Sequence, residues 1–140
     1  IPQSILSGTI PNLQKLDLSR NQLASVPPEI GLLTQLIELN LDDNVVVCLP
    51  EEVGKLVKLK QLSLKNNKMV AFIDGKRQTI PEVVFTSTPL IDLNLHGNPM
   101  TSTQLNHMKG FDAFLEQRQK VKTSGLIGGA MTNLDVCGLE

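Results

Sequence analysis

The sequence contains neither tryptophan nor tyrosine, and four phenylalanines bring its aromatic content to only 3% of 140 residues. Hydrophobic residues nevertheless make up 41% of the chain and charged residues 19%, which is ordinary for a globular protein with one core. A core built almost wholly from Leu, Ile and Val is typical of many small, similar packing sites. One large, irregular core is not expected.

Strong charge of either sign is also missing. The formal net charge is −1 and the pI is near 6.1, so no overall field favours nucleic acid or an anionic membrane. No apolar run approaches the roughly 20 residues that a membrane-spanning helix needs. The N-terminus shows no basic region followed by an apolar stretch, so no signal peptide is visible. We therefore expect neither nucleic acid binding nor membrane insertion.

Cysteine is scarce as well, with Cys48 and Cys137 far apart and outside any motif. Secreted repeat domains of this size often carry paired cysteines in their caps, so this sequence favours a reducing, cytoplasmic setting. Neither cysteine has a His or a second Cys at metal-ligand spacing, and we expect no metal and no cofactor.

The sequence does contain a strong internal repeat. Four segments align without gaps on the pattern L-x-x-L-x-L-x-x-N-x-L: LQKLDLSRNQL, LIELNLDDNVV, LKQLSLKNNKM and LIDLNLHGNPM, beginning at Leu13, Leu36, Leu59 and Leu90. The first two steps are each 23 residues long. Repeats of this length indicate a solenoid, in which each unit buries its apolar face against its neighbours.

Each repeat predicts one short strand followed by a turn. In Leu16-Asp17-Leu18 apolar residues alternate with a polar one, which indicates a strand with one buried face. Side by side, these strands form a parallel sheet. The asparagines that follow are expected to satisfy backbone groups at the turn and to stack as a row along the solenoid: Asn21, Asn44, Asn67 and Asn98.

The second half of each repeat begins with an apolar residue and a proline, at Val26, Leu49 and Ile80. Proline fits the first turn of a helix, so these segments predict short 3₁₀ or helical turns on the convex side. The side chains expected to point back under the sheet are those of Ile30, Leu33, Val53, Leu56, Val83 and Val84.

Two irregularities interrupt this order. Residues 1–6 read as the second half of a repeat whose strand is missing, which predicts that more repeats precede the first residue. The step from Leu59 to Leu90 is 31 residues, and the surplus lies in VAFIDGKRQT, residues 70–79. Insertions in solenoids emerge as loops. Two interpretations stand: a tolerated loop that turns at Asp74 and Gly75, or a loop that contacts a partner through Lys76 and Arg77.

After Met100 the pattern becomes helical. Thr101 and Gln104 have the spacing of a capping box, and an apolar face recurs at intervals of 3 and 4 through Leu105, Met108, Phe111, Phe114, Leu115 and Val121. We expect one helix over residues 101–123 that covers the last repeat, with a detachable partner-binding helix as the alternative. Residues 124–140 read as an irregular tail whose apolar members lie along the solenoid: Leu126, Ile127, Met131, Leu134 and Val136.

The predicted fold class is therefore an α/β solenoid with a parallel concave sheet, short 3₁₀ or helical convex turns and a C-terminal capping helix. Its predicted parts are repeats over 1–100, a capping helix over 101–123 and a tail over 124–140. The 23-residue step and the L-x-x-L-x-L-x-x-N-x-L and L-P-x-x-I motifs resemble the intracellular Ras-group class of leucine-rich repeats. The C-terminal MKGFDAFLEQRQKVK and LDVCGLE resemble the end of a leucine-rich-repeat-containing protein. This resemblance implies an adaptor without enzymatic activity.

Strand geometry identifies the residues that face away from the core. They form a polar, mildly acidic surface without an aromatic or arginine anchor: Lys15, Asp17, Ser19, Glu38, Asn40, Asp42, Gln61, Ser63, Lys65, Asp92, Asn94 and His96. A protein partner of this surface is expected to present basic residues. Two other contact surfaces remain open: repeats outside this sequence, and a lateral patch of Val45, Val47 and Cys48, for which local packing is the alternative.

No arrangement of residues indicates catalysis. His96 and His107 have no accompanying Ser or Cys motif, and the pair Gly128-Gly129 is too short for a phosphate loop. The main hypothesis is a non-catalytic scaffold that binds protein through its concave face. The alternatives are a substrate-recognition arm of a larger enzyme or signalling regulator, and a structural spacer.

Overall fold

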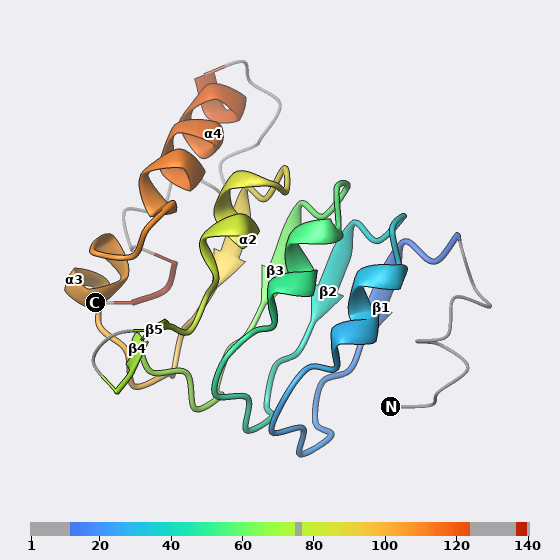
Figure 1. Cartoon of the computed structure of the whole chain (residues 1–140), viewed down its shortest axis with the longest axis horizontal. Helices are drawn as coiled ribbons and strands as arrows, with labels where there is room; N and C mark the ends of the chain where they lie inside the picture. The colour runs from blue at the N-terminus through green and yellow to red at the C-terminus, as the bar shows by residue number, and fades with distance from the viewer. Residues whose placement is uncertain (1–11, 75–76, 124–136, 140) are drawn as a thin grey trace.

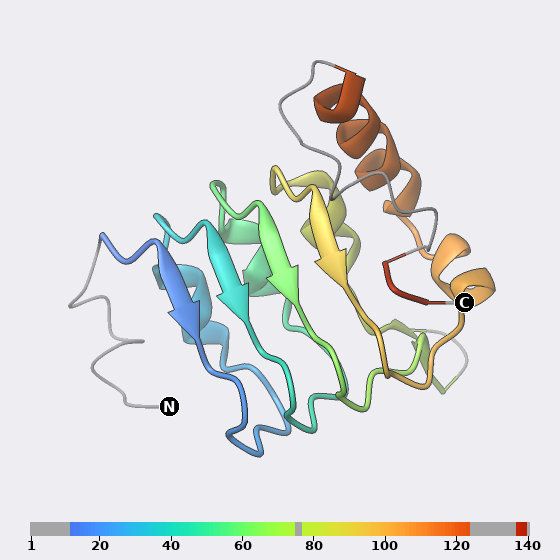
Figure 2. The same ribbon diagram turned by 180° about the vertical axis from the view of Figure 1, so that it is seen from behind.

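Four parallel strands form the sheet that the repeat predicts (Figure 1). The computed structural model describes residues 12–74, 77–123 and 137–139. The strands β1 (Lys15–Asp17), β2 (Glu38–Asn40), β3 (Gln61–Ser63) and β6 (Asp92–Asn94) lie in that order in one sheet. Seen from behind, all four arrows run in one direction (Figure 2). Equivalent repeat positions are in register: Leu16 pairs with Leu39, Leu39 with Leu62 and Leu62 with Leu93. The predicted solenoid is confirmed.

Short helical turns cover the other side of the core (Figure 1). They are the 3₁₀ turns η1 (Pro28–Leu32) and η2 (Glu51–Lys55) and the α-helix α2 (Glu82–Thr86). A proline precedes the first helical residue of each, at Pro27, Pro50 and Pro81. Proline suits this place because its fixed φ is compatible with the cap and no N–H is required there.

The core lies between these turns and the sheet, and it consists of the repeated apolar positions. Ile30, Leu33, Val53, Leu56 and Val84 are buried as predicted. Val83 is not, because it lies one position before the buried site and 38% of its surface is exposed. Its side chain instead lies over Gly54 of the preceding turn, where a Cβ atom would come within 2.7 Å of the Val83 Cγ2. The prediction for Val83 was therefore wrong by one residue of register.

The predicted asparagine row is present, and it joins each repeat to the next. The Asn44 Oδ1 accepts the N–H groups of Asn21 and Leu23, both at 2.9 Å. Its Nδ2 donates at 3.0 Å to the carbonyl oxygens of Leu18 and Leu41. Asn67 repeats this arrangement one step along, with the Val46 N–H at 3.0 Å and the carbonyls of Leu41 and Leu64 at 2.9 and 3.0 Å. The side chains of Asn44 and Asn67 are 4% and 2% exposed, so they replace water for these groups.

Replacing Asn67 with Ala is expected to lower the free energy of unfolding by about 3 kcal/mol or more, since it leaves several buried backbone groups unpaired. Urea denaturation measures the loss. Asn21→Ala is the matched control: Asn21 is exposed and the change is expected to cost about 1 kcal/mol. Equal losses in the two variants would contradict the proposed role of the buried row.

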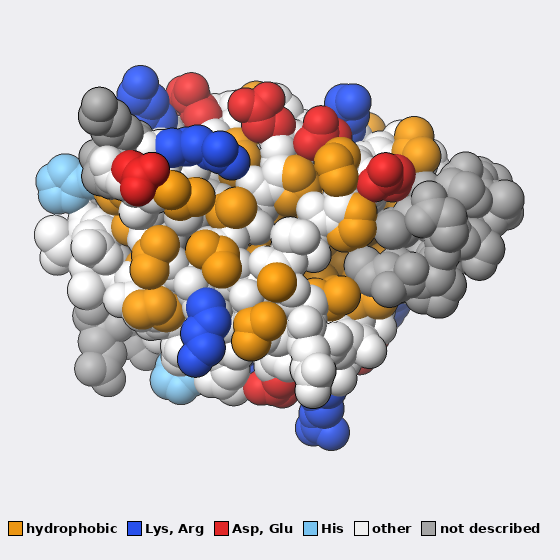
Figure 3. Space-filling view, turned by 60° about the horizontal axis from the view of Figure 1, so that its bottom comes forward, with side chains coloured by type: hydrophobic (Ala, Val, Ile, Leu, Met, Phe, Trp, Pro, Cys, Tyr) orange, Lys and Arg blue, Asp and Glu red, His pale blue; other side chains and the backbone are white. Residues whose placement is uncertain are grey.

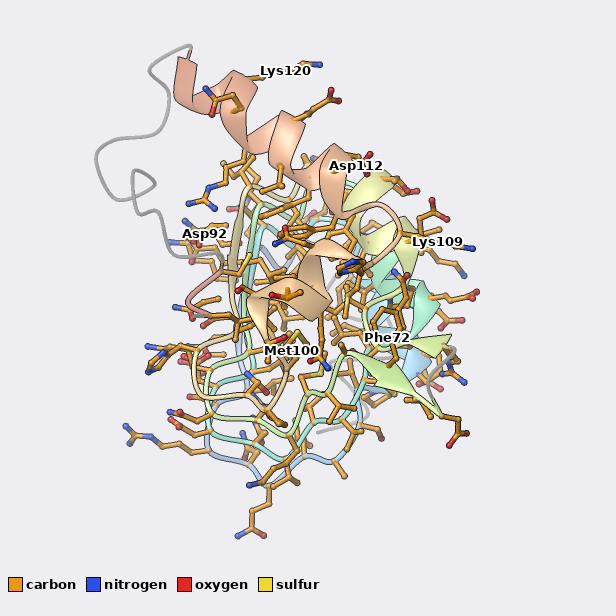
Figure 4. The ribbon with its side chains drawn as sticks, turned by 90° about the vertical axis from the view of Figure 1, so that its left-hand side faces the viewer. Phe72, Asp92, Met100, Lys109, Asp112 and Lys120 are labelled. Atoms are coloured by element: carbon orange, nitrogen blue, oxygen red, sulfur yellow. The ribbon has the colours of Figure 1, made fainter. Side chains whose placement is uncertain are left out.

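The insertion at residues 70–79 folds as a small antiparallel hairpin of β4 (Phe72–Ile73) and β5 (Arg77–Gln78). Asp74, at φ 53°, begins its turn, as predicted. Lys76 lies outside the described residues. The hairpin also holds the C-terminal segment. The Gln78 Oε1 accepts the Lys109 N–H at 2.8 Å, and its Nε2 donates to the carbonyl oxygens of Ile80 and Lys109 at 2.7 and 3.0 Å. Phe72 and Lys109 can be located in Figure 4.

The single helix predicted over 101–123 is wrong: two helices, α3 (Ser102–Asn106) and α4 (Phe111–Thr123), occupy this range. The predicted capping box is present, with Thr101 Oγ1 accepting the Gln104 N–H at 3.2 Å. The interruption is at Gly110, which has φ +89° and packs so closely on α2 that a Cβ atom would lie 3.0 Å from the Glu82 Cγ. This break turns the chain before α4, which the apolar spacing alone did not reveal.

An aromatic cluster joins α4 to α2. The ring of Phe85 meets that of Phe111 edge-on at 5.5 Å, and Phe111 stacks on Phe114 at 5.5 Å. Leu105, Met108, Phe111 and Phe114 are buried, as the helical pattern predicts, and Phe85 is buried with them. Leu115 is an exception, with 38% of its surface exposed. In the tail, the apolar residues named above lie outside the described residues, as do residues 1–6.

Gln78→Ala is expected to lower the free energy of unfolding by about 1–2 kcal/mol, because it removes three hydrogen bonds between the hairpin and its surroundings. The adjacent exposed Arg77 provides the control, and Arg77→Ala is expected to change stability by less than about 0.5 kcal/mol. Faster amide exchange at Lys109 in the Gln78 variant alone identifies the contact. The same loss in both variants would show that the hairpin does not hold the cap through Gln78.

Candidate functional site

The twelve polar residues predicted to face away from the core lie in three rows across the sheet. The first row and the middle row are placed by the strand register, and the last row follows the strands. The first row is Lys15, Glu38, Gln61 and Asp92. The middle row is Asp17, Asn40, Ser63 and Asn94. The last row is Ser19, Asp42, Lys65 and His96. The first two rows line a groove of about 430 Å³ on the sheet.

The middle row is committed to the fold. The carboxylate of Asp17 accepts the Ser19 N–H at 2.9 Å, and the side chains of Asn40 and Asn94 accept the corresponding N–H groups at 2.9 and 3.0 Å. Each bond closes the backbone where a strand ends, as Asp and Asn side chains commonly do. The hydrogen bonds from Ser19 also lower the pKa of Asp17, because they favour its ionised form. The recurrence of Asp or Asn at this position of the repeat is the sequence signal for this role, which the predicted binding surface did not take into account.

The third strand lacks that residue, and its neighbour substitutes for it. Ser63 occupies the Asp or Asn position, and the carboxylate of Asp42 reaches across to accept the Lys65 N–H at 2.9 Å and the Ser63 hydroxyl at 2.6 Å. Lys65 approaches the other oxygen of Asp42 at 3.9 Å. Asp42 therefore holds the turn of the next repeat, which distinguishes it from a carboxylate free to meet a partner.

The first row has no such role. Lys15 and Glu38 form an exposed ion pair at 3.8 Å, which contributes little to stability. The side chains of Gln61 and Asp92 make no hydrogen bond with the part of the chain that the structure describes. Alternation along the strands alone predicts the same role for all twelve residues. The hydrogen bonds divide them, and the first row is the part whose chemistry is available to a ligand.

Asp92 is the most unusual member of the first row. It is half-buried beside the C-terminal cap, and its position on the sheet side of the molecule is visible in Figure 4. Burial raises the pKa of its carboxyl, and the charge of Arg118 on α4 opposes that shift. When the pKa of a carboxyl is raised by folding, ionisation of that carboxyl lowers the stability of the fold as the pH rises. Groups whose charge costs stability in this way occur often at functional sites.

The histidines and cysteines of the described residues offer no catalytic arrangement. His96 is exposed, and its Nδ1 lies 3.3 Å from the Gly138 carbonyl oxygen. Cys48 is half-buried and Cys137 is buried. Among residues 12–74, 77–123 and 137–139, no three His, Cys, Asp or Glu side chains are grouped so that they hold a metal ion. Within the same ranges, no helix is both long and apolar enough to span a bilayer.

A second surface lies at the edge of the solenoid where the strands end. Figure 3 shows hydrophobic side chains gathered over this edge. Val45 and Val47 are 39% and 40% exposed, while the intervening Val46 is buried. Val70 of the next repeat is 38% exposed. Val45 and Val47 therefore have the exposure that the predicted lateral patch requires, while Cys48 is half-buried. Contact of this patch with a partner stays a prediction.

Asp92→Asn is expected to leave the free energy of unfolding at pH 7 unchanged or to raise it, because it removes a charge that burial disfavours. The difference from wild type should shrink as pH falls and Asp92 becomes protonated in both states. Asp42→Ala is the contrasting variant, with an expected loss of about 1–2 kcal/mol. Urea titrations at several pH values measure both. A clear loss of stability in Asp92→Asn at pH 7 would contradict this account.

Comparison with known proteins is consistent with this geometry. Residues 11–69 match the family model described as leucine rich repeat. A leucine-rich-repeat protein of Leptospira interrogans is similar in structure, with a TM-score of 0.68 and 29% identity over 84% of this chain. This chain covers 26% of that protein's length. Human trophoblast glycoprotein, a Wnt-activated inhibitory factor, has a similar fold, with a TM-score of 0.56 and 20% identity. The match covers 75% of this chain and 39% of the length of that protein.

No curated protein matches the sequence. The family match covers the first three repeats, and the parallel strands and convex turns extend the same architecture to β6. No catalytic family is indicated by these comparisons. The repeat stack of this chain therefore has the leucine-rich-repeat fold, which generally mediates protein–protein interaction.

Proposed function

We propose that this chain is a non-catalytic scaffold that binds another protein through its concave face. The observation that supports the proposal most is the division of that face by its hydrogen bonds. Asp17, Asn40, Asp42 and Asn94 hold the strand ends. The first row, which lines the groove together with the middle row, serves no comparable structural purpose. An acidic group that costs stability, such as Asp92, fits a surface that is completed by a partner.

The charge of the first row indicates the chemistry of the partner. Lys15 and Glu38 offset one another, and Asp92 adds a carboxylate at the opposite end of the row. A partner that presents basic side chains complements this surface, and such complementarity acts mainly on specificity and association rate. Nucleic acid is not proposed, because the chain carries no positive surplus.

We also propose a class for the leucine-rich repeats of this chain. The motifs resemble the intracellular Ras-group repeats, and the C-terminal segment resembles the end of leucine-rich repeat-containing protein 40. We propose a cytoplasmic, signalling-related setting on that basis. The parts proposed are repeats over 1–100, a cap over 101–123 and a tail over 124–140. The alternative is that the same face serves as the substrate-recognition arm of a larger enzyme or signalling regulator.

The double variant Glu38→Lys with Asp92→Lys is expected to abolish partner capture by reversing the charge at two first-row positions. Asp42 is left intact, because its loss would disturb the third repeat. The matched control is Glu29→Lys with Glu51→Lys, which makes the same charge change on the exposed convex side. A partner of the concave face should be recovered from cell extract by the wild type and by the control. The double variant should not recover it.

A purified partner found in this way allows a quantitative test. Its affinity should fall as ionic strength rises from about 0.05 to 0.5 M, since the contacts are exposed and screened by salt. Equal affinity in wild type and the double variant would exclude the concave face as the binding surface. The main contact would then lie elsewhere, for example on repeats outside this sequence.

A further inference from the structure

The C-terminal residues Cys137–Leu139 lie against the last strand of the sheet, beside β6 in Figure 2. At one equivalent position of each repeat, a backbone N–H donates to the next repeat in the same way. The bonds from Leu18 to Asn40, from Leu41 to Ser63 and from Leu64 to Asn94 are all 2.8 Å long. The N–H of Leu95 continues this series at 2.7 Å, but its acceptor is the carbonyl oxygen of Cys137. Cys137 thus takes the position that a further repeat would fill.

The fit of this segment is close. Gly138 has φ +80°, and a Cβ atom there would come within 2.9 Å of the Asn94 Oδ1 and 3.1 Å of the His96 Cβ. Its carbonyl oxygen lies 3.3 Å from the His96 Nδ1. On either side, Cys137 and Leu139 are only 4% and 6% exposed. The segment is therefore docked on the sheet. A backbone hydrogen bond holds it, two of its side chains are buried, and its glycine stands where the backbone and the space require glycine.

The edge strand of a sheet carries unpaired N–H and C=O groups, which readily pair with a strand of another chain. Here β6 is such an edge, and the docked segment occupies its carboxyl end, at the N–H of Leu95. We propose that Cys137–Leu139 protects this edge, replacing the strand of a further repeat and preventing β6 of one molecule from pairing with β6 of a second copy. The second copy is the fitting partner because two identical edges brought together about a two-fold axis present the same donors and acceptors to each other.

The thiol of Cys137 reports whether the segment is docked. Burial raises its pKa from 9.0 to about 12, and the nearby carboxylate of Asp92 adds to this effect while Arg118 opposes it. Because thiolate is the reactive form, a shift of this size lowers the reactive fraction at neutral pH by roughly 1,000-fold. Release of the segment should restore ordinary reactivity. Cys48, which is half-buried, is the other cysteine of the sequence. Cys48→Ser therefore leaves Cys137 as the single thiol.

The test compares three full-length proteins that all carry Cys48→Ser. In the first, iodoacetamide at pH 7 should modify Cys137 at least about 100-fold more slowly than in the urea-unfolded chain. Adding Gly138→Val should raise that rate at least about 10-fold, because the new side chain has no space beside Asn94. His96→Ala is the control: it removes one exposed contact, leaves Gly138 its space and should change the rate less than about 3-fold.

Amide exchange and sedimentation separate edge protection from general loss of structure. In Gly138→Val the Leu95 amide should lose protection while the equivalent amides of Leu41 and Leu64 keep it. The variant should also form dimers at concentrations where the control is monomeric. Leu139→Asp, which undocks the segment without adding bulk beside β6, should reproduce both results.

Three outcomes would overturn the proposal. The first is a Cys137 thiol that reacts in the folded control as fast as in the unfolded chain. The second is a Leu95 amide that stays protected in both undocked variants. The third is that both undocked variants stay monomeric at every concentration tested, although amide exchange shows that the Leu95 N–H is exposed. None of these measurements involves a concave-face partner, so their outcome is independent of the proposed function.

Discussion

The asparagine side chains between repeats are the interaction on which the rest of the structure depends. Each repeat turns sharply after a strand of only three residues, and that turn leaves backbone groups inside the solenoid with no strand to pair with. The amides of Asn44 and Asn67 accept from one repeat and donate to two, so the turns of successive units are fixed relative to each other. Leucines supply the burial, and the asparagines set the stacking.

This rigid stacking explains how so short a sheet presents a regular surface. Residues 23 apart meet in register, and polar side chains at equivalent positions form rows. The fold uses one row for its own turns, through Asp17, Asn40 and Asn94, and it borrows Asp42 where the third repeat carries serine. A protein surface divided in this way has a structural part and a part that is free for recognition. A substitution on the concave face tests binding only when it changes a residue of the recognition part and leaves the structural part intact.

The C-terminal region closes the solenoid at three places. Phe111 and Phe114 pack on Phe85 of α2, and Gln78 of the inserted hairpin binds the turn before α4. The carbonyl oxygen of Cys137 pairs with the Leu95 N–H at the end of β6. The hairpin thus has a use that neither interpretation of its sequence included. The two strands of the insertion, β4 and β5, pair with each other. The hairpin that they form reaches from the third repeat to the turn before α4.

The sequence by itself determined the repeat: strand positions, buried leucines, proline-initiated turns and the asparagine row all follow from a local pattern recurring at 23 residues. It also identified the concave residues, since side chains alternate along a strand. Only the tertiary structure decided which of them are available, because the hydrogen bonds of Asp42 run to another repeat. The same is true of the break at Gly110, the exposure of Val83 and the docking of Cys137. Each depends on contacts between residues far apart in the chain, which a local period does not encode.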